Sequence, residues 1–174
     1  MTSKIFMNKV TNSREDFLQE VVNILEEQGI PFCVIGGLAD NAYTEPVVSL
    51  DLDVVVVAGQ IDKLVDLLNK RFKVDKQPHS INISTTSADI RLQIQTDSRY
   101  QEFITRAGYK DVLGYNLPVA DIEDVLQGKI WVYSDSTRRP SKRQKDLADI
   151  MRIIETYPEL ISNLPESIKK VVAQ

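Results

Sequence analysis

Alternation of apolar and polar side chains is clearest at residues 88–95, where the period of two predicts a strand with one buried face. A second strand is predicted at 51–57, because Asp51-Leu52-Asp53 is followed by four valines, a pattern typical of a strand buried on both faces. Shorter apolar runs predict strands at 32–35 and 80–84. These strands supply the predicted sheet.

Helical spacing of apolar residues predicts helices between the strands and after them. The expected helices lie near 13–28, 60–71, 98–106, 121–133 and 141–154, with a short one after Gly37 and short pieces between and beyond Pro158 and Pro165. Asn12 or Ser13 is expected to cap the first, and Ser141 the last long one. Gly108 and Gly114 suggest a hairpin between two of them.

This order of elements predicts the α/β (α+β) class: a small mixed β-sheet flanked by helices, with a helical C-terminal region. We expect one domain over 1–174, with a core at about 13–119 and the helical part at about 120–174. Cys33 lies inside the first strand, which excludes an internal disulfide and predicts a small buried side chain.

Composition narrows the class of protein only slightly. The chain is 43% hydrophobic and 26% charged, with a net charge of −4. This balance argues against broad nonspecific nucleic-acid binding, although it allows a local basic patch. No apolar run has the length of a membrane span, and residues 1–10 lack the core of a signal peptide. We therefore expect a soluble, cytoplasmic protein.

The first chemical signal is the pair of carboxylates at the start of the 51–57 strand. Residues i and i+2 of a strand project from the same face, so Asp51 and Asp53 point together. Adjacent carboxylates repel each other and are costly to desolvate, and a bound cation removes both penalties. Ligands that are all oxygen favour a hard ion such as Mg²⁺.

The second signal is the turn Gly36-Gly37, which ends the 32–35 strand. Glycine tolerates positive φ and lets a ligand approach the backbone closely. A turn that leads into a helix also presents free N–H groups to an anion. Thirteen residues separate Gly37 from Asp51. A phosphate-binding turn beside a metal-binding pair is what metal-assisted nucleotidyl transfer requires.

These residues, together with Ser49-Leu50-Asp51-Leu52-Asp53, resemble the signature of the polymerase-β-type nucleotidyltransferase superfamily. The likeness is closest to the small bacterial AbiEii-like toxin nucleotidyltransferases, and it spans roughly 32–154. It implies that two aspartates and a third carboxylate on a neighbouring strand bind two divalent ions, Mg²⁺ or Mn²⁺. It also implies that the glycine turn holds the triphosphate of an NTP substrate.

Asp89 is the candidate for the third carboxylate. If the 88–95 strand pairs beside the 51–57 strand, Asp89 can stand about 5 Å from Asp51 or Asp53, as cross-strand neighbours do. The alternative is that Asp89 belongs to a polar face turned to water.

Lys129 falls on the apolar stripe of the 121–133 helix, where a lysine is unexpected. It is predicted to direct its charge at a phosphate, and the segment QGKIWVYSD resembles the lysine-bearing helix of the AbiEii-like group. The alternative is a side chain that snorkels to the rim.

The run at 138–145 is the one dense basic segment, and KRQKDLADI resembles a segment that lies close to the nucleotide in the same group. Lys142 with Asp146, and Lys145 with Asp149, have the i,i+4 spacing of solvated ion pairs, which is the alternative reading. From Leu38 to Leu50 there is no lysine or arginine, which lowers the expected affinity for triphosphate.

The sequence therefore predicts transfer of a nucleoside monophosphate from an NTP to a hydroxyl. The predicted catalytic and metal-binding residues are Asp51, Asp53 and Asp89, and the predicted nucleotide-binding residues are Gly36, Gly37, Ser49 and Lys129. The acceptor is left open between tRNA, another protein and a small molecule, and the basic run mildly favours RNA. The resemblance suggests a role in phage defence or a toxin–antitoxin system with a cognate antitoxin. The alternative is a catalytically silent binding or antitoxin-like protein on the same scaffold.

Overall fold

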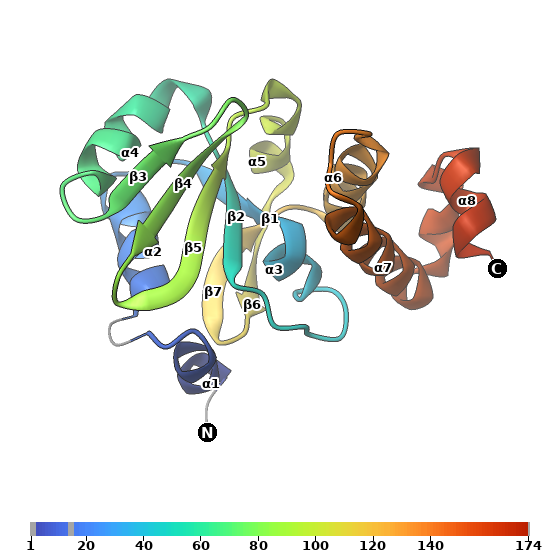
Figure 1. The fold of residues 1–174 in the computed structure, drawn as a ribbon, viewed down its shortest axis with the longest axis horizontal. Helices are drawn as coiled ribbons and strands as arrows, with labels where there is room; N and C mark the ends of the chain where they lie inside the picture. The colour runs from blue at the N-terminus through green and yellow to red at the C-terminus, as the bar shows by residue number, and fades with distance from the viewer. Residues whose placement is uncertain (1–2, 14–15, 174) are drawn as a thin grey trace.

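The computed structural model describes residues 3–13 and 16–173, in which seven strands form one mixed sheet (Figure 1). The strands are β1 (Phe32–Ile35), β2 (Asp51–Val56), β3 (Lys73–Lys76), β4 (Ser80–Thr85), β5 (Ala88–Gln95), β6 (Gly108–Val112) and β7 (Tyr115–Val119). Their order across the sheet is β3-β4-β5-β2-β1-β7-β6. β2 lies at the centre, antiparallel to β1 and parallel to β5. The predicted fold class is confirmed.

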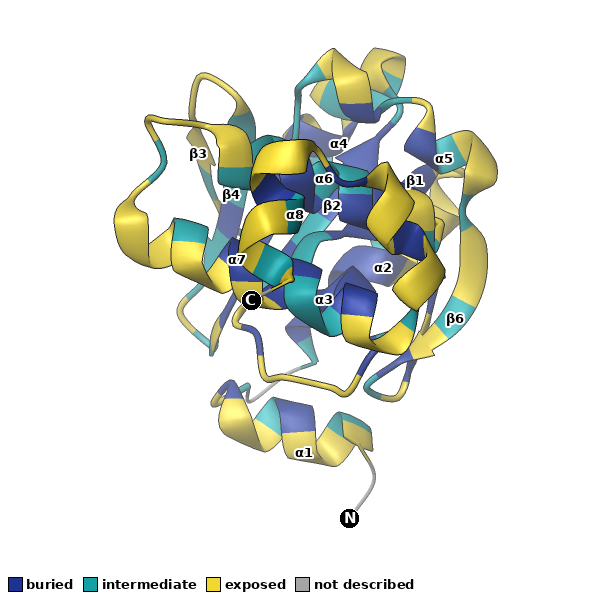
Figure 2. Ribbon diagram, turned by 90° about the vertical axis from the view of Figure 1, so that its right-hand side faces the viewer, coloured by how far each residue is buried: buried dark blue, intermediate teal, exposed yellow. Residues whose placement is uncertain are grey.

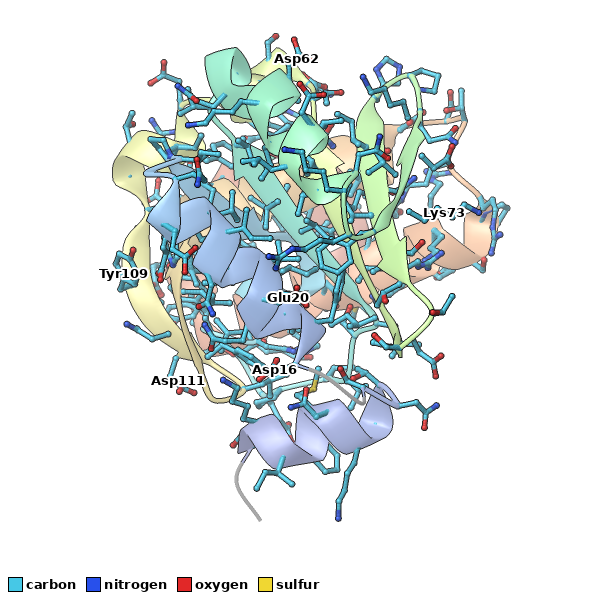
Figure 3. All side chains as sticks on the ribbon, turned by 90° about the vertical axis from the view of Figure 1, so that its left-hand side faces the viewer. Asp16, Glu20, Asp62, Lys73, Tyr109 and Asp111 are labelled. Atoms are coloured by element: carbon cyan, nitrogen blue, oxygen red, sulfur yellow. The ribbon has the colours of Figure 1, made fainter. Side chains whose placement is uncertain are left out.

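Helices pack on both faces of this sheet. They are α1 (Ser3–Val10), α2 (Phe17–Glu27), α3 (Gly36–Asp40), α4 (Ile61–Leu68), α5 (Phe103–Arg106), α6 (Ile122–Ser134), α7 (Pro140–Thr156) and α8 (Glu166–Val172). Short 3₁₀ turns are η1 (Ala58–Gln60), η2 (Ser98–Tyr100) and η3 (Pro158–Asn163). α2 and α4 cover one face, and α3, α6 and α7 lie on the other (Figure 1). Figure 3 views the first face, with Lys73 near one sheet edge and Tyr109 and Asp111 on the opposite edge strand.

The core follows the apolar pattern of the central strands. Val54, Val55 and Val56 are fully buried, as expected for a strand covered on both faces. Cys33 is also buried, and burial raises the pKa of its thiol to about 12. Figure 2 shows buried residues in the central strands, while the helices at the surface are exposed on their outer sides.

Four local features differ from the sequence prediction. The structure contains α1 and the edge strand β3, whose polar residues hide the strand pattern. α2 begins at Phe17 and is capped by Asp16, whose carboxylate accepts a hydrogen bond from the N–H of Gln19 at 3.2 Å. Asn12 and Ser13 precede that helix. α7 begins at Pro140, a residue suited to a first helical turn because it has no N–H to satisfy, so Ser141 is not its cap.

Among the described residues, none of the helices has the length and apolar character needed to cross a membrane.

Candidate active site

The carboxylate pair opens β2 on the face of the sheet that is turned to α6 and α7. Asp51 and Asp53 are both partly exposed, whereas Leu52 between them is buried against the opposite face. Asp53 lines a cavity of about 120 Å³ that is closed by residues of α6 and α7, including Lys129 and Asp146. The common orientation of the pair, which the period of the strand predicts, is therefore found in the structure.

The glycine turn lies against this pair. Gly36 has φ of +69°, in the left-handed region, and a Cβ at this position would lie 2.3 Å from Oδ2 of Asp53. Glycine is therefore required here both by the backbone conformation and by the closeness of the carboxylate. β1 and β2 bring the two together, since Ile35 is the partner of Asp53 in the antiparallel ladder.

Gly37 faces two polar side chains from distant parts of the chain. The position that a Cβ would take on Gly37 lies 3.6 Å from Oγ of Ser49 and 3.6 Å from Nζ of Lys145. The Ser49 hydroxyl donates to the backbone carbonyl of Asp51 at 3.2 Å. Lys145 comes from α7 and is exposed. Lys145 thus places a positive charge beside the turn, where residues 38–50 provide none. The sequence did not predict this position, because the i,i+4 spacing suggested that Lys145 pairs with Asp149.

Desolvation dominates the electrostatics of Asp53. Burial raises the pKa of its carboxyl to about 6, and repulsion from Asp51 acts in the same direction. Lys129 and Lys145 act in the opposite direction. A carboxyl in this environment gains from a cation that binds beside it.

The structure does not bring Asp89 to the pair, so the predicted cluster of three carboxylates is not formed. β5 does pair with β2, but in this register Asp51 stands opposite Arg91 and Asp53 opposite Gln93. Asp89 lies before the paired stretch and accepts a hydrogen bond from the Asn12 side chain at 2.5 Å. The pairing prediction was right and the register was wrong, because alternation defines a face and not a position along it.

Arg91 makes the main contact of Asp51. Its guanidinium lies 2.9 Å from Oδ1 of Asp51 through one terminal nitrogen and donates through Nε at 3.1 Å. In the part of the chain that the structure describes, no group of three acidic, histidine or cysteine side chains is arranged to hold a metal ion. The carboxylate oxygens of Asp51 and Asp53 are of the ligand type that Mg²⁺ or Mn²⁺ prefers.

Lys129 is buried, with an exposed fraction of 6%. Its Nζ lies 2.5 Å from Oδ2 of Asp149, and it also lines the cavity beside Asp53. It therefore does not snorkel to the rim. The contact of Lys129 with a phosphate stays a prediction. In the structure its ammonium group forms an ion pair with Asp149.

The two aspartates of α7 have partners other than those that helical spacing suggests. Asp146 binds the guanidinium of Arg138 at 2.5 and 3.1 Å, in place of Lys142. Asp149 binds Lys129 and Arg152, in place of Lys145. The solvated i,i+4 pairs are therefore replaced by contacts that leave Lys145 directed at the glycine turn.

Arg152 connects α7 to the loop between α3 and β2. It donates to the carboxylates of Asp40 at 3.2 Å and Asp149 at 3.0 Å, to the Thr44 hydroxyl at 2.7 Å, and to the carbonyl of Glu45. Asp40 is fully buried, and burial raises the pKa of its carboxyl to about 6 while Arg152 opposes that shift. Nothing in the sequence near either residue indicates this network.

The fold of this chain is similar to that of several solved structures. No protein-family model matches the sequence, and a search of curated proteins found no match. Solved structures do match. ANT(2″)-Ia in complex with adenylyl-2″-tobramycin has a TM-score of 0.59 at 15% identity, over 90% of this chain and 92% of that one. LnuA, a lincosamide antibiotic adenylyltransferase with lincomycin bound, has a TM-score of 0.56 at 13% identity, over 82% and 99%.

A third match is an antigenic nucleotidyltransferase-like protein from Paracoccidioides brasiliensis, with a TM-score of 0.54 at 17% identity over 99% of this chain and 88% of that one. The chain therefore has the nucleotidyltransferase fold. The glycine turn and the Asp51–Asp53 pair lie together in that fold, on adjacent strands.

Proposed function

We propose that the protein transfers a nucleoside monophosphate from an NTP to a hydroxyl group, with Mg²⁺ or Mn²⁺ held by Asp51 and Asp53. The observation that carries this proposal is the contact between the glycine turn and the second aspartate, at a cavity wall. A divalent ion at this pair would polarise the phosphate and stabilise charge that develops in the transition state.

The chain's own residues have separable roles in this reaction. Gly36 makes room for the Asp53 carboxylate, and Gly37 leaves the backbone of the turn open to phosphate oxygens. Ser49 orders the start of β2, and Lys145 neutralises charge over the turn. The acceptor oxygen forms a bond to the α-phosphorus, the bond to the β-phosphate oxygen breaks, pyrophosphate leaves, and the acceptor proton passes to solvent. The charge of Lys129, at the wall of the same cavity, favours the ionised form of the Asp53 carboxyl.

The acceptor is proposed to be a small hydroxyl compound. ANT(2″)-Ia and LnuA were solved with an adenylylated antibiotic and an antibiotic respectively, and the cavity here is enclosed by α6 and α7. An RNA acceptor is less supported, because Arg138 and Arg143 of the basic run have partners within the protein. We also propose a role in phage defence, with a cognate antitoxin as partner, on the basis of the resemblance to the AbiEii-like group.

The test is transfer of label from α-labelled NTPs to a mixture of small hydroxyl compounds, RNA and protein in the presence of Mg²⁺. Asp51→Asn and Asp53→Asn are each expected to reduce transfer by at least 100-fold while the circular dichroism spectrum stays the same. Asp66→Asn, at an exposed position on α4 on the opposite face of the sheet, is the matched control and should transfer normally. Full activity in Asp53→Asn would exclude this site.

Two observations favour the catalytically silent alternative: Asp51 is already paired with Arg91, and Gln93 stands where a carboxylate was expected. Calorimetric titration with Mg²⁺ and each NTP separates the two functions. Metal-dependent NTP binding supports the enzyme, and absence of binding supports the silent scaffold.

A further inference from the structure

The side chains that β5 presents to the carboxylate pair determine how many cations the site can take. On that strand, Arg91 stands opposite Asp51 and Gln93 stands opposite Asp53. Both come from the polar face of β5, so both face the same side as the pair. The nearest strand therefore contributes one positive and one neutral side chain where the resemblance predicted a carboxylate.

The surroundings of Asp51 are also rich in positive charge. Asp51 borders an open groove of about 310 Å³ on the β3–β4–β5 side, and the cations lining it are Lys73, Arg91 and Lys142. Arg91 already contacts Oδ1 of Asp51 at 2.9 Å. Apart from Asp51, the carboxylate that lines this groove among the described residues is Asp75 on β3, which accepts a hydrogen bond from the Gln77 side chain at 2.7 Å. A second divalent ion on this side would meet the repulsion of the three cations, and β5 offers it no carboxylate opposite the pair.

Gln93 borders both the groove and the enclosed cavity, so it lies between the two sides of the pair. Its amide oxygen can accept a hydrogen bond or weakly ligate an ion, but it brings no negative charge. Asp124 and Asp146 also line the cavity, and each is held by an arginine: Arg106 at 2.8 Å and Arg138 at 2.5 Å.

We propose that this site takes a single divalent cation, through Asp51 and Asp53, and that Arg91 and Gln93 prevent the binding of a second. This inference rests on the proposed function, in which the pair binds metal. It assigns to Arg91 a positioning role: the guanidinium holds the Asp51 carboxylate and occupies the side from which another ion would approach. Transfer would then rely on one metal ion and on fixed positive side chains.

The experiment counts Mn²⁺ ions bound per chain, by electron paramagnetic resonance of free Mn²⁺ in a titration of the full chain. The wild type is expected to bind one. Gln93→Asp is expected to bind two, because it adds the missing carboxylate opposite Asp53. Gln95→Asp is the matched control, on the same strand and face and also at the cavity wall but opposite Val55, and it should stay at one.

Arg91→Gln tests the second half of the proposal. It is expected to bind one Mn²⁺ about tenfold more tightly than the wild type, because a cation no longer competes for Asp51. Arg99→Gln, which removes an exposed arginine paired with Asp97, should not change the affinity.

Two ions in the wild type would overturn this inference and leave the proposed enzyme intact. No ion in the wild type would overturn both. A single ion in Gln93→Asp, or unchanged affinity in Arg91→Gln, would show that these residues do not limit the site.

Discussion

At the scale of single residues, the site depends on a glycine that no other residue can replace. Gly36 combines a left-handed φ with a carboxylate oxygen that occupies the space of a Cβ. In the sequence, the pair Gly36-Gly37 predicts an open turn that can bind phosphate. The structure adds that part of this space belongs to Asp53, so the turn and the carboxylate are built as one unit.

Gly36→Ala should therefore damage both stability and ligand binding. The left-handed conformation alone costs an alanine about 1–2 kcal/mol, and the new methyl group displaces the Asp53 carboxylate. We expect a loss of roughly 2 kcal/mol in the free energy of unfolding, measured in urea, and loss of Mn²⁺ binding. Gly59→Ala is the control, since nothing lies within 4 Å of its Cβ position, and it should differ little from the wild type.

At the scale of elements, α7 is held to the rest of the molecule by charged contacts that are buried. Lys129 of α6 and Arg152 of α7 meet at Asp149, and Arg152 continues to Asp40 of α3. Three helices from separate parts of the chain thus share one network. It orients α7 so that Lys145 reaches the glycine turn.

Breaking the buried pair between α6 and α7 should be costly. Lys129→Met leaves Asp149 with Arg152 as its remaining cation, so we expect a loss of about 3 kcal/mol in the free energy of unfolding. Adding Asp149→Leu should recover most of this loss, because the uncompensated charge is removed. Lys170→Met, at an exposed position on α8, should stay within about 0.5 kcal/mol of the wild type. Equal losses in the single and double variants would contradict the argument.

Asp40 should make stability depend on pH. Burial raises the pKa of its carboxyl from 3.8 to about 6, so between these values the folded protein binds more protons than the unfolded chain. Its stabilising contribution is thus complete below pH 3.8 and lost as the pH rises through 6. Relative to Asp40→Asn, the wild type should lose about 2.4 kcal/mol between pH 4 and pH 7 in urea unfolding. Stability curves of the wild type and Asp40→Asn that run parallel across this pH range would contradict the prediction.

At the scale of the whole molecule, the cavity needs both the sheet and the C-terminal helices. Its walls include Asp53 on β2 and Asp146 on α7. A ligand that contacts both the sheet and α7 is therefore expected to stabilise the packing of the C-terminal helices on the sheet. This geometry explains why the helical C-terminal region, in which the sequence already predicted Lys129 as a nucleotide-binding residue, has a place in the site.

Thermal melting with Mg²⁺ and the preferred NTP tests this shared cavity. At a ligand concentration of 100 times Kd, stabilisation is about 2.7 kcal/mol, which corresponds to a rise in Tm of roughly 5–10 °C for a chain of this size. Asp53→Asn in the sheet and Lys145→Gln in α7 should each remove most of the rise. Lys170→Gln should keep it, and a full rise in Lys145→Gln would place the nucleotide elsewhere.

Much of this molecule could be read from neighbouring residues in the chain. Periodicity located β1, β2, β4 and β5 and most helices, and spacing showed that Asp51 and Asp53 share a face beside a glycine turn. These features depend on residues a few positions apart, where backbone geometry alone relates side chains. The sequence did not predict the polar edge strand β3 or the short helix α1, because packing against the rest of the molecule, and not a local pattern, stabilises them.

The partners of the charged side chains required the folded chain. Asp51 meets Arg91 in place of Asp89, and Asp40 meets Arg152, which is 112 residues away. A shift of two residues between parallel strands preserves every buried side chain, so the apolar pattern is silent about which polar residue stands opposite which. Long-range packing settled that question, and with it the charge that surrounds the two aspartates.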